Sequence, residues 1–185
     1  VNKQGMQYCP GIFGKDNGVD AIFGIDAVKI KPSNKSVTLK DGRNIYYTKL
    51  LIAAGGKPFI PEALAKELAC AKKSVFTFTK LDDALKIKDF ASSLKGKSKN
   101  AVIVGGGMIG IKAVGALKNL GFNVTIVELS ERLLGNVFDS TASEIAVSHL
   151  KVNGIKTELS DSIAKLSCKD GLVNKVYLKS GKELP

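Results

Sequence analysis

The sequence has no tryptophan, one histidine and three cysteines, and arginine occurs only at positions 43 and 132. Cys9, Cys70 and Cys168 lie far apart and form no Cys-x-x-Cys pair, which excludes a local redox dithiol and gives no zinc spacing. We therefore expect each cysteine to be a small buried or surface residue rather than a ligand. His149 has no cysteine or carboxylate at ligand spacing, so we interpret it as structural and predict no metal site.

Long apolar runs are also missing. No run approaches the roughly 20 residues that cross a bilayer, and the N-terminal residues lack the charged-then-apolar pattern of a signal peptide. We expect a cytoplasmic protein with no membrane partner. The net charge of +11 comes mainly from lysines spread singly along the chain, and aromatic residues that would stack on bases are few. This pattern predicts a solvated surface and no nucleic-acid partner, with an acidic partner or a polyanion as the alternative.

A glycine motif is the most informative feature that is present. Four apolar residues lead into three successive glycines, Gly105–Gly107, and a fourth glycine at 110 opens a helix-compatible run. The first glycine would permit a sharp turn, the third would let the backbone approach a phosphate, and the fourth would let the helix lie close to the strand. Free N–H groups at the helix start would bind a pyrophosphate. The predicted binding residues are Gly105, Gly106, Gly107, Met108, Ile109 and Gly110.

Glu128 indicates which nucleotide is bound. It follows a second apolar run, Val124–Val127, where its carboxylate can accept hydrogen bonds from both adenosine ribose hydroxyls. Because the same carboxylate would repel a 2′-phosphate, the pattern favours NAD(H) over NADP(H). Arg132 leaves NADP(H) open as a less favoured alternative. The motif alone does not distinguish NAD from FAD, since both are held through the same pyrophosphate.

The flanking segments predict further strands and helices. In the first part of the chain, strands are expected at 21–23, 27–30, 36–39, 45–47 and 50–52. A helix is expected to begin at Thr79, with Asp82 completing its cap, and to end at Gly96. After Glu128 we expect a helix capped by Asp139 or Ser140, a third parallel strand at 155–159 and a hairpin over 163–178.

Two segments repeat one pattern. Residues 37–45 and 176–184 share the spacing of apolar residues around a glycine turn. We interpret them as a duplicated hairpin, with chance similarity of two common hairpins as the alternative. The first copy leads into an expected buried strand at 50–54, whereas the second stops at Pro185.

The order of these motifs resembles the pyridine nucleotide-disulphide oxidoreductase family of FAD- and NAD-linked reductases, especially its NADH oxidase, rubredoxin or ferredoxin reductase and nitrite reductase large-subunit branches. The resemblance covers residues 17–185. It implies an α/β fold: a Rossmann-like dinucleotide-binding domain with a β-meander, plus a partial second domain of the FAD type. The motifs that carry it are Asp41-Gly42, Leu51–Gly55, Thr79–Ala84, Val104–Gly110, Val124–Glu128 and Arg132–Leu134.

The resemblance also implies domain boundaries. Residues 1–60 would be the back half of an FAD-type domain, residues 61–97 a linker with a helix at 79–95, and residues 98–185 an NAD-binding domain without its last strand. Because the family's first glycine motif takes FAD, and precedes this segment, we expect Gly105–Gly110 to take NAD and the chain to be a fragment. Ala27, Ala54 and Gly55 complete the predicted cofactor-binding residues.

Three positions depart from the family pattern. Ala53-Ala54-Gly55 replaces Ala-Thr-Gly, which removes a hydroxyl from the flavin site. Met108 stands where many members have an aromatic residue that covers the nicotinamide pocket, and a thioether would cover it more loosely. Lys112 replaces a glutamate of many members and changes the polar contact on the flavin side.

The implied function is hydride transfer from NADH to FAD and then to an acceptor that the sequence does not name. No residue of this segment is predicted to be catalytic, and the segment alone is expected to bind NADH weakly and turn nothing over. The alternative is a stand-alone, non-catalytic dinucleotide-binding module, closed by strand 50–54 or by strand exchange in a homodimer.

Overall fold

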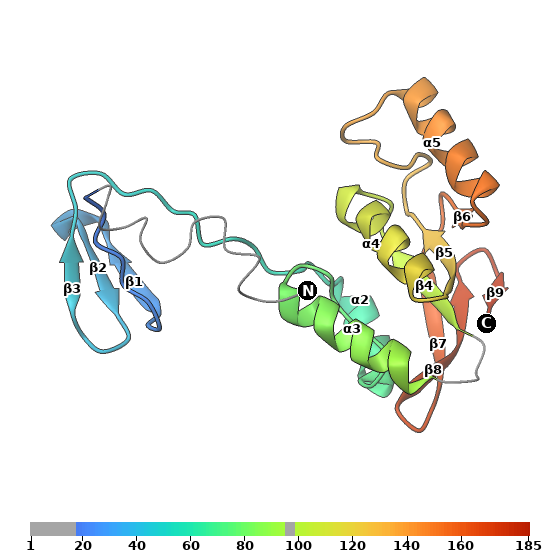
Figure 1. Ribbon diagram of the computed structural model, residues 1–185, viewed down its shortest axis with the longest axis horizontal. Helices are drawn as coiled ribbons and strands as arrows, with labels where there is room; N and C mark the ends of the chain where they lie inside the picture. The colour runs from blue at the N-terminus through green and yellow to red at the C-terminus, as the bar shows by residue number, and fades with distance from the viewer. Residues whose placement is uncertain (1–17, 95–98) are drawn as a thin grey trace. The chain divides into compact units, whose positions relative to one another are not determined.

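The computed structural model describes residues 18–94 and 99–185, and the chain divides into two compact units, Val1–Gly55 and Gly56–Pro185 (Figure 1). Cys9 and the helix end expected at Gly96 lie outside the described residues. Within those described residues, no helix is both long and apolar enough to span a bilayer.

The first unit contains an antiparallel β-meander. Its strands, β1 (Ala27–Lys31), β2 (Ser36–Leu39) and β3 (Asn44–Tyr46), pair in that order, and the 3-10 helix η2 (Pro32–Asn34) joins the first two. Among the described residues of this unit, Ser36 and Leu39 alone are buried. The meander therefore has one apolar residue in its interior.

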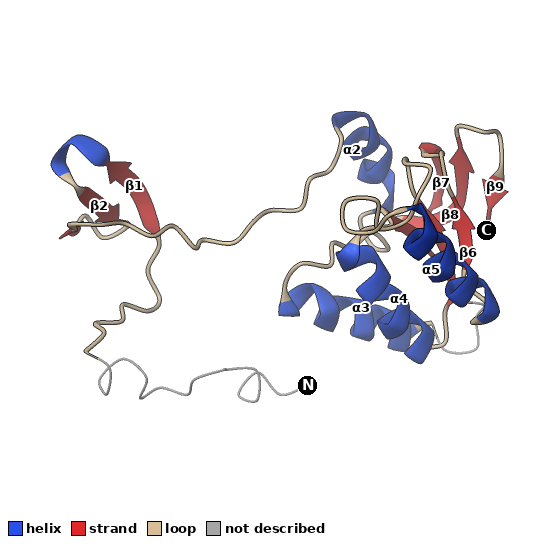
Figure 2. Cartoon of the chain, turned by 90° about the horizontal axis from the view of Figure 1, so that it is seen from above, coloured by secondary structure: helices blue, strands red, loops and turns tan. Residues whose placement is uncertain are grey.

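The second unit is an α/β domain (Figure 2). A parallel sheet of β4 (Asn100–Val104), β5 (Asn123–Val127) and β6 (Lys156–Glu158) is connected by α4 (Met108–Asn119) and α5 (Ser140–Val152). An antiparallel sheet follows, with strands in the order β7 (Ile163–Lys169), β8 (Leu172–Leu178) and β9 (Glu183–Leu184). The remaining elements are α2 (Glu62–Leu68), η3 (Ala69–Ala71) and α3 (Leu81–Ser93).

The alternation of side chains along β5 explains why this unit has two cores. Val124 and Ile126 point to one face, where they pack with residues of α3, α4 and α5, including Leu150. Val127 points to the opposite face and packs with β7, β8 and β9, including Val176. The parallel sheet is therefore the middle layer of three, which is the Rossmann-like arrangement with a β-meander that the sequence predicts.

Two expected strands are not formed. Residues 21–23 and 50–52 form no strand in the described part of the chain, and Phe23 and Leu51 are each 88% exposed. An apolar run becomes a strand only where a neighbouring strand pairs with its backbone groups. The predicted closure of the nucleotide domain by strand 50–54 is therefore wrong, because the parallel sheet consists of β4, β5 and β6.

At the start of both α3 and α5, a carboxylate side chain accepts backbone N–H groups. Asp139 accepts a backbone N–H of the first turn of α5 (2.8 Å), so it is the cap, as predicted. At α3 the carboxylate is that of Asp83, where the sequence predicted Asp82. Asp83 accepts the N–H groups of Thr79 (3.0 Å) and Lys80 (3.2 Å), and the bond from Thr79 leads the interactions that lower the pKa of Asp83.

The two segments of the repeat form hairpins of the same geometry. Leu39 N–H donates to the carbonyl of Arg43 (2.8 Å), and Leu178 N–H donates to the carbonyl of Lys182 (2.9 Å). The glycine of each turn has a positive φ that favours glycine, +90° at Gly42 and +88° at Gly181. The predicted likeness of the two hairpins is confirmed in structure, and their common origin stays an interpretation.

Cys70 and Cys168 form a disulfide between residues that are 98 positions apart. This bond was not predicted from the sequence. Spacing rules detect cysteines that are close in sequence, whereas the fold brings these two together from η3 and β7.

Candidate functional site

The glycine turn lies between β4 and α4, at the carboxyl end of the parallel sheet. Gly105 has φ +103°, and its N–H donates to the carbonyl of Val127 (2.9 Å), which holds the turn against β5. A side chain at Gly110 would overlap the carbonyl oxygen of Gly105 and crowd Ile103. Two predicted roles are therefore confirmed: Gly105 turns the chain, and Gly110 lets the helix lie close to the strand.

Gly106 and Gly107 have different surroundings. A Cβ on Gly106 would overlap the side chain of Leu133, which is fully buried, and would crowd Glu128, so packing favours glycine there. A Cβ on Gly107 would meet nothing within 4 Å, and its φ of −80° is available to any residue. The packing of the protein therefore gives no reason for glycine at 107. A ligand that approaches the backbone would give one, which is the role predicted from the sequence.

The first turn of α4 combines unpaired donors with exposed apolar side chains. The first N–H groups of any helix have no acceptor within the helix, and the positive end of the helix dipole favours an anion. Around this turn Val104, Met108, Ile109 and Leu129 are between 53% and 73% exposed. A group of exposed apolar side chains beside such donors is typical of a ligand site.

Glu128 lies just after β5 and contacts the glycine turn directly. One carboxylate oxygen accepts the N–H of Gly106 (2.6 Å), and the other accepts the N–H of Ser130 (2.7 Å). Partial burial raises the pKa of Glu128, but the hydrogen bonds from Gly106 and Ser130 outweigh it, so the pKa lies below its ordinary value. The ionised carboxylate keeps lone pairs with which it can accept further hydrogen bonds.

Sequence reasoning missed the loop that supports the turn. Leu133 is fully buried against Gly106, and Leu134 N–H donates to the carbonyl of Gly106 (2.9 Å). The hydroxyl of Ser143 in α5 in turn donates to the carbonyl of Leu133. Arg132–Leu134 is part of the family pattern, but nothing in the apolar spacing indicates that a loop leucine supports a glycine turn.

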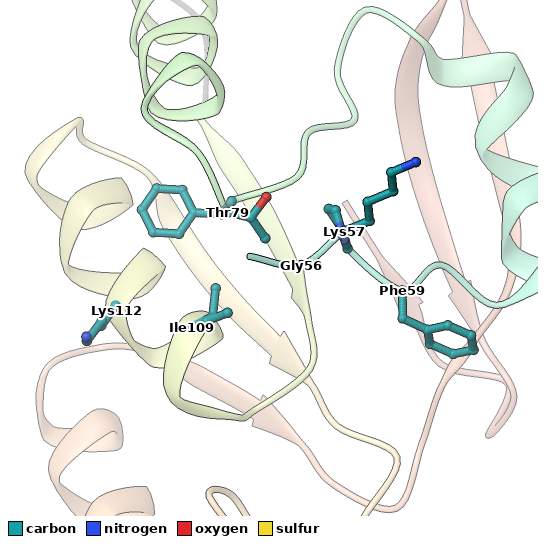
Figure 3. A pocket seen from close by; sticks show the side chains of 8 residues that line it. Gly56, Lys57, Phe59, Thr79, Ile109 and Lys112 are labelled. Carbon is teal, nitrogen blue, oxygen red and sulfur yellow. The ribbon is translucent and has the colours of Figure 1, made fainter. Parts of the chain in front are cut away.

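A pocket of about 520 Å³ lies beside the first turns of α4 (Figure 3). Ile109 and Lys112 line it from the helix, and residues 56–59 and 78–79 supply the other lining residues. Lys57 and Lys112 give the lining positive charge, while two phenylalanines make it largely apolar. Lys112, singled out from the sequence as a departure from the family, thus lines a pocket.

The predicted site residues fall in both units. The second unit brings together Gly105–Gly110 and Glu128, as described above. Ala27, Ala54 and Gly55 belong to the first unit, where Ala27 begins β1 and the other two lie in a segment without strand or helix. All three are exposed.

The geometry of the second unit fits two parts of a dinucleotide. The bare backbone at Gly107 and the N–H groups that begin α4 suit a pyrophosphate, which needs close approach and several donors. The ionised carboxylate of Glu128, fixed by two hydrogen bonds, suits the hydroxyls of a ribose.

The sequence of the chain is similar to those of known oxidoreductases. The sequence profile of the family described as pyridine nucleotide-disulphide oxidoreductase matches residues 8–185. The NAD(P)H sulfur oxidoreductase (CoA-dependent) of Pyrococcus abyssi is 30% identical over 177 residues, which are 95% of this chain and 38% of that protein. Rubredoxin-NAD(+) reductase of Pseudomonas putida is 26% identical over 175 residues, which are 95% of this chain and 43% of that protein.

The whole of this chain aligns with part of a solved structure. A chain in the crystal structure of the covalent putidaredoxin reductase–putidaredoxin complex aligns with a TM-score of 0.82 at 19% identity, over 100% of this chain and 44% of that one. This chain thus spans less than half the length of each of these three proteins.

Proposed function

Because the chain belongs to the pyridine nucleotide-disulphide oxidoreductase family, whose members are FAD-dependent reductases that use NAD(H) or NADP(H), we propose that it is the NADH-binding segment of such a flavoprotein. In the whole enzyme, bound NADH would supply a hydride to FAD, and the electrons would then pass on to an acceptor. One observation carries the proposal: Gly107 is a glycine that the fold does not need, at the start of a helix with free N–H groups.

Residues of the second unit would bind the adenosine half of NADH. The N–H groups that follow Gly107 would donate to the pyrophosphate, and the open space over that residue would admit it. Glu128 would accept hydrogen bonds from the ribose hydroxyls while keeping its bonds to Gly106 and Ser130. A 2′-phosphate there would meet an ionised carboxylate, so NADH should bind better than NADPH.

We place the nicotinamide half at the pocket beside α4. The pocket takes none of its lining residues from β5 or β6, the strands on the side of Glu128, so it leaves the ribose position free. Ile109 and two phenylalanines offer apolar surface to a nicotinamide ring, and the lysines at 57 and 112 offer cations to its phosphate side. No side chain of this segment needs to transfer a proton, so its contribution is binding and orientation.

Gly107→Ala tests the proposal with little effect on folding. Since a Cβ at 107 meets open space, the variant should keep the thermal midpoint of the wild type. It should weaken NADH binding by at least about tenfold, because the methyl group would occupy the space of the pyrophosphate. Affinity is measured by titrating the 185-residue chain with NADH, NADPH and FAD while following fluorescence or heat.

Gly115→Ala is the matched control. Gly115 also lies in open space, but in the third turn of α4. Its replacement should leave NADH affinity unchanged and stabilise the helix slightly, by about 0.5–1 kcal/mol. Equal NADH affinity in the wild type and in Gly107→Ala would refute the proposed position of the pyrophosphate, and tighter binding of NADPH or FAD than of NADH would refute the proposed ligand.

Finer features of the whole protein are part of the same proposal. We assign residues 1–60 to an FAD-type domain and residues 98–185 to the NAD-binding domain, and we propose a cytoplasmic location. The electron acceptor, a protein or a small molecule, is left unnamed. A homodimer is tested by light scattering of the whole protein, and the location by fractionation of cells.

A further inference from the structure

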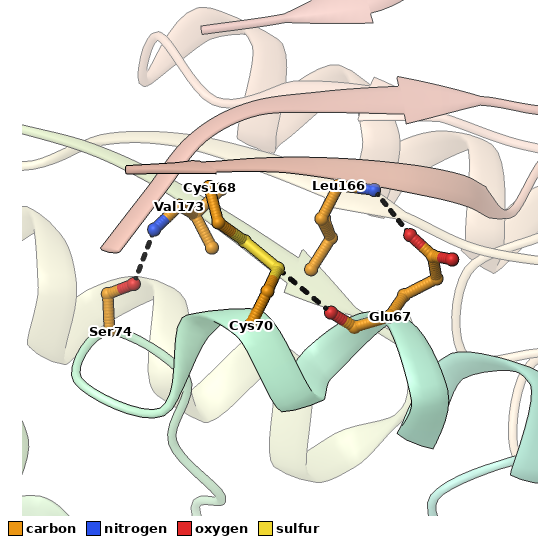
Figure 4. Close-up of a disulfide and its surroundings, with 6 residues drawn as sticks. All are labelled: Glu67, Cys70, Ser74, Leu166, Cys168 and Val173. Atoms are coloured by element: carbon orange, nitrogen blue, oxygen red, sulfur yellow. Dashed lines mark hydrogen bonds between the residues drawn. A yellow bond between two sulfur atoms is a disulfide. The ribbon is translucent and has the colours of Figure 1, made fainter. Parts of the chain in front are cut away.

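A second kind of chemistry is present away from the glycine turn, where Cys70 and Cys168 form a disulfide (Figure 4). Their Cα atoms are 6.0 Å apart, which is ordinary for a disulfide. Cys70 lies in η3 and is exposed, whereas Cys168 lies near the end of β7 and packs against the core that contains Val176. Cys70 is therefore the more exposed residue of the pair, and its sulfur is the expected point of attack for a thiolate in solvent.

Hydrogen bonds on both sides of Cys70 hold its segment to the antiparallel sheet without the disulfide. Before it, the carboxylate of Glu67 accepts the N–H of Leu166 in β7 (3.0 Å). After it, the hydroxyl oxygen of Ser74 accepts the N–H of Val173 in β8 (2.8 Å). These bonds would keep the two sulfurs close to each other in the reduced protein, which favours rapid closure again.

Packing also holds the segment around Cys70 against the antiparallel sheet. Ala71, next to Cys70, is fully buried in the core formed with β7, β8 and β9. Lys73 donates its N–H to the carbonyl of Gly171 (3.1 Å) and its ammonium to the carbonyl of Asp170 (3.0 Å). The disulfide is thus one of several contacts, so its loss should loosen the segment and leave the domain folded.

We propose that Cys70–Cys168 is a reversible thiol–disulfide exchange site for low-molecular-weight thiols, distinct from the nucleotide site. A thiolate attacks Sγ of Cys70, forms a mixed disulfide and expels the thiolate of Cys168, which takes up a proton. A second external thiolate then attacks the external sulfur of the mixed disulfide, and Cys70 leaves as a thiolate that takes up a proton. Two external thiols become one disulfide, and the protein disulfide gains two electrons and two protons. An oxidised small disulfide drives the reverse reaction.

The position of the site gives the exchange a structural consequence. Residues 56–59 and 78–79 both line the pocket beside α4, and the segment that joins them contains Cys70. Oxidation adds a covalent link at the middle of this segment, while reduction leaves only the non-covalent contacts. We expect local opening of residues 62–74 to be more frequent in the reduced protein.

Thiol titration and hydrogen exchange test the proposal in the 185-residue chain. Cys9→Ser leaves only the pair, so the chain should show no free thiol after incubation with oxidised glutathione, two after dithiothreitol, and none after reoxidation. In the reduced form, amides of residues 62–74 should exchange roughly tenfold faster, while those of α5 keep their rates. Both measurements are made without NADH, so the outcome does not depend on the ligand of the glycine turn.

Cys168→Ser and, as a second variant at the exposed position, Cys70→Ser are the controls. Each should exchange at the rate of the reduced chain whether or not a thiol is added. The proposal is overturned by two free thiols that persist in oxidised glutathione, by a disulfide that resists dithiothreitol, by equal exchange in both forms, or by unfolding of the whole unit on reduction.

Discussion

The two β-meanders contain the same hairpin in different surroundings. In the second unit, Val176 pairs with Leu184, and these side chains are 4% and 5% exposed. In the first unit, Val37 pairs with Ile45, and Ile45 is 40% exposed. The turn and the pairing are alike, so they follow from the local sequence. Burial differs, so it comes from the elements against which each hairpin packs.

The second meander has three kinds of support from its own unit. The parallel sheet covers it, through contacts that include Val127. The disulfide attaches it to η3. An ion pair joins Lys182 in its last turn to Glu158 of β6 (2.6 Å). Local sequence therefore sets the shape of a hairpin, while tertiary contacts set most of its stability.

The largest expected difference between the meanders is in packing. Val176→Ala should lower the free energy of unfolding of the second unit by about 2 kcal/mol, because two buried methyl groups are lost and a cavity is left. Val37→Ala, at the matching and half-buried position, should cost less than about 1 kcal/mol. Hydrogen exchange of the amides of Leu178 and Leu39 reports each hairpin separately. Equal losses would show that burial does not distinguish the two hairpins.

A change in the turns should instead have equal effects. Gly42→Ala and Gly181→Ala each place a Cβ at a φ near +90° with open space around it. The cost is local backbone strain, which we expect to be about 1 kcal/mol in both hairpins. The same amide exchange rates measure it. A cost confined to one hairpin would mean that the turn geometry depends on tertiary contacts.

The smallest expected effect is that of acid on stability. Asp161 is buried and its pKa is lowered, chiefly by the hydrogen bond from the side chain of Ser180, whereas Asp41 is exposed and its pKa is lowered chiefly by the backbone N–H of Arg43. A lowered pKa contributes stability above the ordinary value of 3.8, and this contribution is lost as the pH falls through the lowered value.

Asp161→Asn should therefore destabilise the second unit at pH 7, and this effect should shrink as the pH falls from 3.8 through the lowered pKa of Asp161. Asp41→Asn should have a smaller effect at either pH, because water screens its interactions. Urea unfolding at pH 7 and pH 3 measures both. A deficit of Asp161→Asn that is unchanged at pH 3 would assign the loss to packing rather than to charge.

The sequence predicted the elements whose signals are local. The glycines at 105 and 110, the cap at Asp139 and both hairpin turns depend on neighbours within a few residues, and the structure has them as expected. The prediction of a strand at 50–52 was wrong, because an apolar run does not reveal whether another strand lies beside it.

The parts of the candidate site that sequence reasoning missed depend on distant contacts. Leu133 supports Gly106 from a loop, and Lys57 joins Lys112 in lining a pocket from a segment far along the chain. The partners Cys70 and Cys168 come together only when the α2–η3 segment docks on β7. No periodicity or spacing reports such pairings, since they arise from the tertiary fold.

The bond between Glu128 and Gly106 limits how the coenzyme preference can be redesigned. The carboxylate that would exclude NADPH is also an acceptor that holds the phosphate-binding turn in place. Replacing Glu128 with a small neutral residue to admit a 2′-phosphate would leave the N–H of Gly106 without its acceptor. The turn that both coenzymes need would then be held less firmly. A switch of specificity at this position therefore requires a paired change: one that removes the negative charge and another that restores an oxygen facing Gly106.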